Sequence, residues 1–324
     1  MQNLLDPAIL FFIFGVLAGA LRSNLEIPPA IAKFLSLYLL MALGLKGGFA
    51  LSKSGFNDTV AIALMAAVIM ATVVPLLGYW LLKKTLSPFD AAALTAAYGS
   101  VSAVTFLTAM QYLESRGMPF GGHMVAAMVV MESPAIIIAV LLANTIRSKQ
   151  KTPGDGAASS NTRLSSILHE SLTNGAHFLL IGSMVIGYLT GDAGKAMMQP
   201  FSVDLFKGML AFFLLDMGLM VAKNVGAIRG KSAVLIGYAA LSPFVHAAMA
   251  LGLAALVGMG AADAALLMVL SASASYIVVP AVLRFAIPEA NPSIYFGLAL
   301  GITFPINILM GIPLYTRLAQ WALA

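Results

Sequence analysis

Apolar stretches of about 20 residues recur along this chain from end to end, and this recurrence limits the fold more than any other feature. A helix of that length crosses the hydrocarbon core of a bilayer, which is about 30 Å thick. Of the 324 residues, 60% are hydrophobic and only 10% are charged, whereas a soluble domain carries about 25% charged residues. The stretches show no strict alternation of apolar and polar residues, so they predict helices rather than barrel strands.

About ten membrane spans are expected, and the predicted fold class is therefore an all-α integral membrane protein. Residues 147–163 form the least hydrophobic stretch, and they are rich in Gly, Ser and charge, as linkers are. We expect a first five-helix repeat over 1–148, a linker over 149–166 and a second repeat over 167–324. The expected spans are 7–22, 29–51, 58–82, 90–114, 120–147, 167–190, 202–222, 232–258, 263–286 and 292–320.

The two halves carry matching polar residues and prolines in the same order. Residues 90–102 align without gaps on 263–275, and the motif at 132–134 falls opposite the motif at 303–305. A repeat with an odd number of spans enters the membrane in the opposite sense from its partner. The halves are therefore expected to be inverted, which is a common architecture of secondary transporters.

Basic residues in the loops predict the orientation of the chain. Twelve Lys and Arg residues fall on the side of the central linker and six on the other side. Because cytoplasmic loops carry an excess of Lys and Arg, we expect a cytoplasmic linker and periplasmic termini in a bacterial inner membrane. The first apolar run has Asp6 before it and Arg22 after it, which predicts a retained helix rather than a signal peptide.

Small hydroxyl residues interrupt the fourth and ninth expected spans, at 98–105 and 271–280. Serines at alternate positions suit an unwound segment, because residues i and i+2 do not share a helix face. Gly99 and Pro280 weaken a continuous helix further. Paired broken helices are the best sequence pointer to a transport site, although close helix packing through small residues is the alternative. Half-helix N-termini favour an anion. The predicted substrate-binding residues are Gly99, Ser100, Val101, Ser102, Ser273, Ala274, Ser275 and Tyr276.

Polar residues in other spans predict a Na⁺ site near these breaks. Glu132 lies among apolar residues of the fifth span, and an intramembrane carboxylate is a functional candidate. It could bind Na⁺, hold a proton or hydrogen-bond a neighbouring helix. Thr303 and Asn307 offer oxygen ligands in the tenth span. Asp216 could bind a cation or pair with Lys46. The predicted sodium-binding residues are Ser102, Thr105, Glu132, Thr303, Asn307 and Asp216.

The chain carries no motif of an enzyme or of an ATP-driven pump. There is no Walker loop, no Gly-rich dinucleotide-binding loop and no catalytic triad. There is no cysteine, which excludes disulfides and Cys-ligated metals. We expect no cofactor other than Na⁺ as coupling ion. The basic residues lie in short loops, which indicates topology rather than nucleic-acid binding.

Several motifs resemble those of the sodium-dependent bicarbonate transporter family known from cyanobacteria. The resemblance runs over nearly the whole chain and is most specific in the second half. The motifs are Ser271-Ala-Ser-Ala-Ser-Tyr-Ile-Val-Val-Pro280, Ile287-Pro-Glu-Ala-Asn291, Leu300-Gly-Ile-Thr-Phe-Pro-Ile-Asn307, Gly311-Ile-Pro-Leu-Tyr315, Gly44-Leu-Lys-Gly-Gly48 and Gly99-Ser-Val-Ser102.

The resemblance implies a mobile core domain of spans 3–5 and 8–10 and a gate domain of spans 1–2 and 6–7. It also implies Na⁺-driven symport of HCO₃⁻, with both ions between the crossing broken helices, and a homotrimer. Cyanobacterial members are inhibited by a PII-like cytoplasmic protein, but the short linker here argues against that regulator. Glu132 stands where the cyanobacterial proteins have an Asp, and the extra methylene could shift the cation or the substrate.

Three functions remain open from the sequence. The first is Na⁺-coupled symport of a small anion, with bicarbonate as the leading candidate. The second is Na⁺- or H⁺-coupled transport of a larger organic anion on the related bile-acid-transporter plan, with Tyr98, Tyr276 and Phe106 as residues that could set the pocket size. The third is a channel or membrane sensor without coupled transport.

Overall fold

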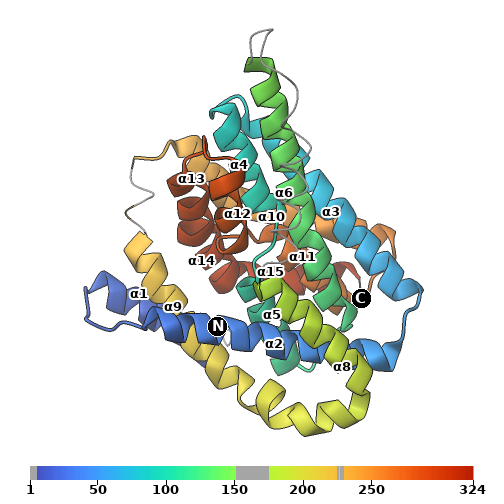
Figure 1. Ribbon diagram of the computed structural model, residues 1–324. Coiled ribbons are helices and arrows are strands. Elements are labelled where there is room, and N and C mark those ends of the chain that lie inside the picture. The colour runs from blue at the N-terminus through green and yellow to red at the C-terminus, as the bar shows by residue number, and fades with distance from the viewer. Residues whose placement is uncertain (1–5, 151–174, 225, 227–229, 324) are drawn as a thin grey trace.

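The computed structural model describes residues 6–150, 175–224, 226 and 230–323, and within these ranges the chain forms helices and connecting segments without a strand (Figure 1). Most of the predicted linker, and the first residues of the predicted sixth span, lie outside the described residues. Seven helical stretches of the described chain are long and apolar enough to cross a membrane. The chain is therefore a multi-pass membrane protein.

Helices occupy all ten predicted ranges. The predicted sixth span ends at residue 190, whereas the helical segment α8 continues to Gln199. Gly191 has non-helical backbone angles (φ 53°, ψ −138°), so a first helix ends there, next to the predicted end at residue 190, and a second helix follows to Gln199. The elements are α1 (Pro7–Ala20), α2 (Pro29–Ser54), α3 (Asp58–Leu82), α4 (Pro88–Gly99), α5 (Ala103–Ser115), α6 (His123–Gln150), α8 (Gly175–Gln199), η2 (Pro200–Asp204), α9 (Phe206–Asn224), α10 (Ala233–Leu256), α11 (Ala261–Ala272), α12 (Val278–Ala286), α13 (Pro292–Leu298), η4 (Ala299–Thr303), α14 (Phe304–Ile306), η5 (Asn307–Gly311) and α15 (Ile312–Ala322).

Four helices pack together in the lower part of Figure 1: α1 against α9, and α2 against α8. We call them the four-helix group. Glycines permit this packing, since a Cβ on Gly15 of α1 would lie 2.3 Å from the Leu215 carbonyl oxygen of α9. A Cβ on Gly48 of α2 would lie 2.1 Å from the Met184 carbonyl oxygen of α8. Small residues at helix contacts are typical of membrane proteins, because lipid provides no hydrophobic force between helices.

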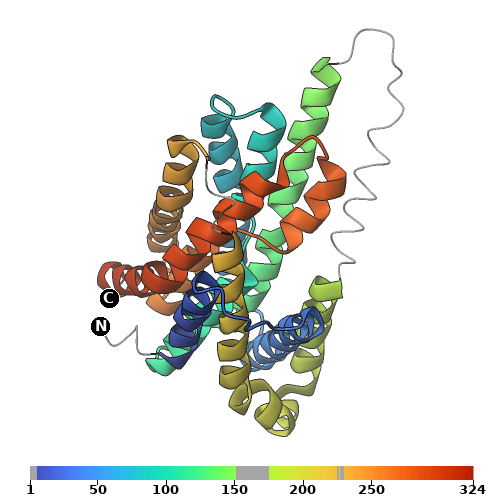
Figure 2. The ribbon, with the colours of Figure 1, turned by 90° about the vertical axis from the view of Figure 1, so that its left-hand side faces the viewer.

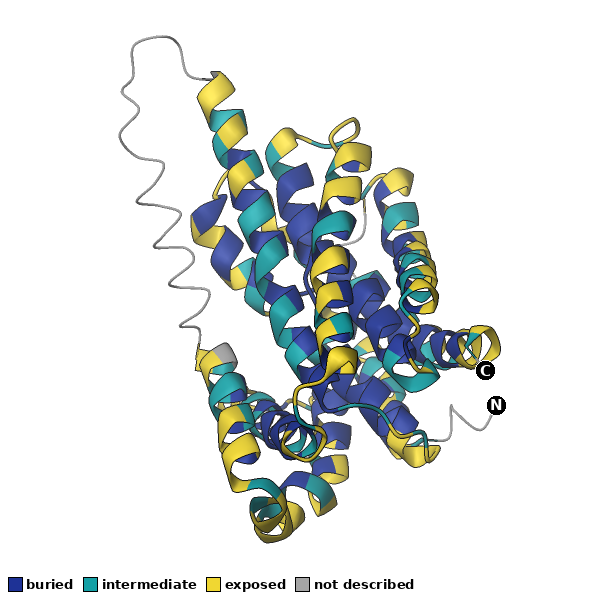
Figure 3. Cartoon of the chain, turned by 90° about the vertical axis from the view of Figure 1, so that its right-hand side faces the viewer, coloured by how far each residue is buried: buried dark blue, intermediate teal, exposed yellow. Residues whose placement is uncertain are grey.

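The other helices, α3 to α6 and α10 to α15, form a second unit, which we call the crossing group (Figure 2). Its centre holds the two short helices α4 and α11, which α3, α6, α10 and α15 surround. In the most apolar part of the α4–α5 segment, 94% of the residues are buried inside the protein, whereas the share in α10 is 39%. Buried residues fill the interior and exposed residues cover the outer surfaces (Figure 3). The interrupted helices thus lie in the middle of the protein.

Two aspartates at the starts of α4 and α11 make equivalent contacts. The Asp90 carboxylate accepts a hydrogen bond from the Asn291 N–H at 2.7 Å, just before α13. The Asp263 carboxylate accepts one from the Gly121 N–H at 2.7 Å, just before α6. Each short helix therefore holds the loop that leads into the last long helical segment of the other half of the chain.

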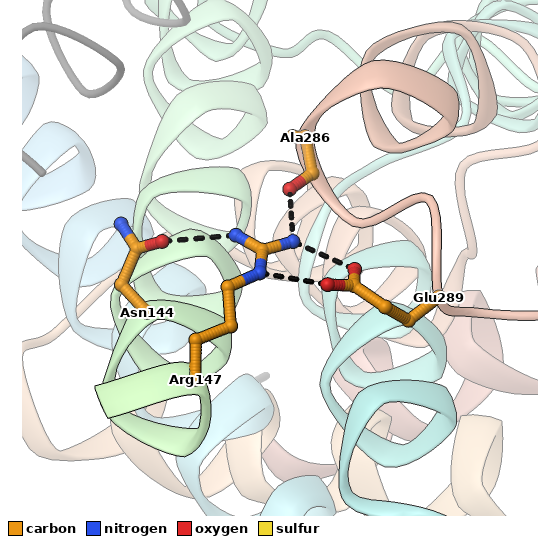
Figure 4. Close-up of polar contacts among 4 residues, drawn as sticks. All are labelled: Asn144, Arg147, Ala286 and Glu289. Atoms are coloured by element: carbon orange, nitrogen blue, oxygen red, sulfur yellow. Dashed lines mark hydrogen bonds and ion pairs between the residues drawn. The ribbon is translucent and has the colours of Figure 1, made fainter. Parts of the chain in front are cut away.

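An arginine near the end of α6 fixes the far end of α12 (Figure 4). Arg147 makes a two-pronged ion pair with Glu289, with N–O distances of 2.8 and 2.7 Å. The same guanidinium donates to the carbonyl oxygen of Ala286, the last residue of α12, at 2.9 Å. A planar fork of donors is well suited to such paired contacts. Because α12 is held at this end, its N-terminus has a defined position in the protein interior.

Candidate functional site

The two predicted interruptions are confirmed, since each span is broken into two helices. α4 ends at Gly99 and α5 begins at Ala103, while α11 ends at Ala272 and α12 begins at Val278. A tight contact explains the first break: a Cβ on Gly99 would lie 2.7–2.8 Å from the ring carbons of Pro75 in α3. Only glycine allows α4 to end against that ring.

The unwound segments touch each other through hydrogen bonds. The Ser102 N–H donates to the Ser273 Oγ at 2.9 Å, and the Ser275 N–H donates to the Ala97 carbonyl oxygen at 2.7 Å. All four residues are buried. Backbone groups that leave a helix inside a membrane must find other partners, and here each break supplies partners for the other. The breaks therefore form one crossing site.

Serine hydroxyls accept from backbone N–H groups at both helix N-termini of this crossing: Ser102 is the N-cap of α5, and Ser275 lies two residues before the N-cap of α12. Ser102 Oγ accepts from the Thr105 N–H at 3.3 Å and from the Thr105 hydroxyl at 3.0 Å. Ser275 Oγ accepts from the Val279 N–H at 3.3 Å. Each serine oxygen thus satisfies the helix and still has one hydrogen to donate, and the Tyr276 hydroxyl lies within hydrogen-bonding reach of Ser102. Because helix N-termini carry partial positive charge, the acceptor best suited to these hydrogens is an anion.

The opposite helix end at the crossing, the C-terminus of α11, is held by side chains. Ser273 Oγ donates to the Leu270 carbonyl oxygen at 2.8 Å, and Asn307 Nδ2 donates to the Ala272 carbonyl oxygen at 2.8 Å. The Tyr315 hydroxyl donates to Asn307 Oδ1 at 3.0 Å. Both ends of the Asn307 amide are therefore occupied, and this side chain positions the end of α11.

A cavity of about 60 Å³ lies beside the crossing. The capping serines Ser102 and Ser275, with Tyr276, line it from the two breaks, and Glu132 lines it from α6. α2, α8 and α9 close the other side, so the cavity lies between the crossing group and the four-helix group. The lining residues are Ser36, Leu39, Leu40, Val101, Ser102, Ala103, Val104, Leu107, Met128, Glu132, Ala176, Leu180, Phe213, Ser275, Tyr276, Ile277 and Val278.

Glu132 brings a carboxylate to this cavity, and the residue is buried, with 7% of its surface exposed. Its backbone carbonyl oxygen accepts from the Ser100 hydroxyl at 3.4 Å, which ties α6 to the first break. Thr105 lies behind Ser102 and reaches the site through the hydroxyl contact between them. Hydroxyl and carboxylate oxygens are the ligands that hard cations prefer. Ser102 and Glu132 therefore bring oxygen atoms of this kind to the same cavity.

Four predicted sodium-binding residues do not line this cavity: Thr105, which lies behind Ser102, and Thr303, Asn307 and Asp216. Thr303 Oγ1 contacts the Tyr98 hydroxyl at 2.7 Å and donates to the Ala239 carbonyl oxygen at 2.8 Å. Pro243 cannot donate to that carbonyl four residues earlier, so Thr303 satisfies it instead. Asn307 holds α11. Asp216 is buried in α9.

Other predicted residues lie around the cavity in different ways. Gly99, Ser100, Ser273 and Ala274 form the crossing behind the cavity wall, whereas Val101 and Tyr276 line it.

Lys46 pairs with Glu114 at 3.2 Å rather than with Asp216, because α2 passes the end of α5 at that level. Tyr98 and Phe106 do not line the cavity, and Tyr98 is engaged by Thr303.

The four-helix group contributes lining residues that the sequence did not predict. Ser36 of α2, Leu180 of α8 and Phe213 of α9 close the cavity opposite the breaks. None of them belongs to a local motif or a matched interruption. Their role depends on how two groups of helices meet, and periodicity within one helix carries no signal for that contact.

A comparison with family models gave a match to the Na⁺-dependent bicarbonate transporter superfamily over residues 7–320. The comparison with curated proteins gave no match. The matched range includes both breaks, Glu132 and the described helices of the two groups, the last of them, α15, as far as residue 320.

Proposed function

Because that match covers almost the whole chain, the protein belongs to the Na⁺-dependent bicarbonate transporter superfamily, and we propose that it is a Na⁺-coupled symporter of a small anion, with bicarbonate as the leading substrate. Membership makes the chain a transporter and not an enzyme. The substrate, the coupling ion and the mechanism are the proposal.

One observation carries the proposal: two capped helix N-termini, at Ser102 and Ser275, line the same small cavity. Each offers a hydroxyl hydrogen and the positive end of a helix. Bicarbonate is planar and has three oxygens, so it can accept from both serines at once. Hydrogen bonds to a charged acceptor are about twice as strong as those between neutral groups.

The size of the cavity favours a small anion over a larger organic one. A space of about 10–15 Å³ holds one water molecule by the same measure. The cavity of about 60 Å³ therefore has room for a few water-sized groups. An anion of four heavy atoms and a Na⁺ ion match that room, whereas a bile-acid-like substrate would require the two helix groups to separate.

Glu132 gives a physical reason for coupling to a cation. A carboxylate and a bound anion in one cavity repel each other, by about 4 kcal/mol for unit charges about 4 Å apart at an effective dielectric constant of about 20. A Na⁺ ion beside Glu132 replaces this repulsion with attraction. The anion therefore binds well only when Na⁺ is present, which is the requirement for symport.

The fold supports an inverted repeat with a moving core. The equivalent contacts of Asp90 and Asp263 are what two inverted halves would produce, as is the packing of α1 on α9 and α2 on α8. We propose that the crossing group is the core domain and the four-helix group the gate domain. The core would carry the ions across by sliding, elevator-like, along the gate. The periplasmic termini, the homotrimer and the doubtful PII-like regulator stay predictions.

Uptake by purified protein in liposomes tests the proposal and its alternatives. We expect labelled bicarbonate to accumulate under an inward Na⁺ gradient and not under an equal K⁺ gradient. Accumulation that persists without a Na⁺ gradient would remove Na⁺ coupling. Uptake of cholate in preference to bicarbonate would favour the larger organic anion, and equilibration of bicarbonate without accumulation would favour a channel.

A further inference from the structure

A second cavity, of about 850 Å³, lies on the same seam between the four-helix group and the crossing group. It is lined by α2, α5, α6 and α8, the same four helices that contribute to the first cavity. The two cavities are therefore successive spaces along one contact surface.

The wall between the two cavities is thin and apolar. On α5, Leu107 lines the first cavity and Met110 the second; on α6, Met128 lines the first and Val125 the second. Three residues of helix rise about 4.5 Å. All four side chains are buried, with at most 3% of their surface exposed. On α5 and α6, about one side-chain layer thus separates the second cavity from the crossing site, whereas on α2 the nearest lining residues, Leu40 and Lys46, lie about 9 Å apart along the helix.

The wall is closed by close packing of α2 on α6. A Cβ on Gly47 would lie 2.7 Å from the Val125 Cβ, and a Cβ on Gly122 would lie 2.3 Å from the Ala50 Cβ. The helices therefore touch at glycines, without space for a further side chain. Such a contact can part when the two groups move, because no covalent or interlocking element holds it.

Charged residues surround the second cavity, with three lysines against two carboxylates among the lining residues. Lys46 of α2 pairs with Glu114 of α5 at 3.2 Å, and its ammonium lies 4.2 Å from the centre of the Phe206 ring. Lys53 and Lys195 are exposed and make no ion pair among the described residues. The field in this cavity therefore favours an anion over a cation.

We propose that the second cavity is an antechamber in which the transported anion collects, and that Val125 and Met110 form the gate between it and the crossing site. The inference rests on the proposed function for the identity of the anion only. The gate controls access from the second cavity to the crossing site, and this access can be measured without transport.

The absence of cysteine from the chain makes the gate directly testable. Ser36→Cys reports on the first cavity and Ser54→Cys on the second; both lie on α2, and each change replaces a hydroxyl by a thiol. A membrane-impermeant methanethiosulfonate is applied to right-side-out and inside-out vesicles without Na⁺ or bicarbonate. We expect that the reagent, when it is applied to the side of the membrane from which it modifies Ser54→Cys, does not modify Ser36→Cys. Equal rates at both thiols from that side would overturn the gate.

Widening the wall supplies the positive test. Val125→Ala in the Ser36→Cys background should raise the rate of modification from the Ser54 side severalfold, because it removes two methyl groups from the wall. Val140→Ala is the matched control, since Val140 is equally buried on α6 and lines neither cavity. Ser54→Cys carrying Val125→Ala should react at its original rate, and an unchanged melting temperature shows that the protein is folded. A Val125→Ala variant without increase would remove Val125 from the gate.

The charge of the antechamber is tested with reagents of opposite sign. At Ser54→Cys, an anionic methanethiosulfonate should react roughly tenfold faster than a cationic one, after each rate is divided by the rate of the same reagent with a free thiol in solution. Lys53→Gln with Lys195→Gln should abolish this preference. No preference in the starting protein would refute an anion antechamber. If thiol access follows the expected pattern but bicarbonate uptake fails, the proposed substrate is wrong and the gate stands.

Discussion

Ser102 and Ser275 each cap a half-helix and face the cavity, so removing one hydroxyl has two separable effects. We expect Ser102→Ala and Ser275→Ala to lower stability by about 1 kcal/mol through loss of the cap. The loss of a hydrogen bond to a charged acceptor costs about 1.5–3 kcal/mol. The apparent bicarbonate affinity should therefore fall roughly ten- to hundredfold, as measured by concentration-dependent uptake in liposomes.

Ser232 provides the matched control for capping. It caps α10 by accepting from the Leu235 N–H, and it does not line the cavity. Ser232→Ala should show a similar loss of thermal stability with unchanged affinity for bicarbonate. If Ser102→Ala and Ser275→Ala both transported like Ser232→Ala, the serines would be structural only.

Glu132 is the residue whose charge should set the Na⁺ dependence. Glu132→Gln keeps the shape of the side chain and removes the negative charge. Loss of about 1.4 kcal/mol of attraction corresponds to a tenfold weaker site, so we expect the Na⁺ concentration for half-maximal uptake to rise roughly tenfold. Na⁺ titration of bicarbonate uptake measures it, with Glu26→Gln, exposed before α2, as control. An unchanged Na⁺ requirement would leave Glu132 a structural role.

At the scale of elements, the first break depends on Gly99. Gly99→Ala places a Cβ 2.7–2.8 Å from the Pro75 ring carbons, so α4 must move away from α3. Overpacking of this kind costs about 1–3 kcal/mol. We expect a lower melting temperature in detergent and a large loss of transport.

Gly252→Ala is the control for a glycine-to-alanine change in a helix. No heavy atom lies within 4 Å of the Cβ that would be added in α10, so stability and transport should be retained. Equal behaviour of the two variants would mean that the contact between α4 and Pro75 does not shape the break.

The breaks were predictable because their signals are local. Alternating serines lie within a few residues of Gly99 in the first half and of Pro280 in the second half, so the sequence presents the signal twice. The partners of the breaks were not predictable in the same way. Asn307 offers an oxygen in the sequence, but only the packing of the last long segment on α11 turns its amide toward Ala272. Thr303 likewise serves a carbonyl that Pro243 leaves free in another helix.

At the scale of the whole molecule, the two cavities and the wall between them all lie where the four-helix group meets the crossing group. The apolar spans predicted that ten helices cross the membrane, yet the seam that joins these groups has no signature in any single span. If the crossing group moves against the four-helix group, as proposed, this seam must slide or part during transport, whereas contacts within one group can remain fixed.

Two cysteine pairs with the same spacing test whether the two groups of helices move against each other. The Cβ positions of Gly47 and Val125 lie 2.7 Å apart across the seam, and those of Gly44 and Ser183 lie 2.7 Å apart within the four-helix group. A disulfide needs about 3.5–4.5 Å between Cβ atoms, so both pairs require the same small separation of helices.

We expect oxidised Gly47→Cys/Val125→Cys to stop Na⁺-driven bicarbonate uptake and a reductant to restore it, because the bond fixes the two groups. Oxidised Gly44→Cys/Ser183→Cys should retain most of the uptake, since its bond lies within one rigid group. Electrophoretic mobility before and after reduction gives the cross-linked fraction. If the pair across the seam were fully cross-linked and transport continued at its normal rate, the groups would not move against each other, and the ions would have to cross without sliding of the core.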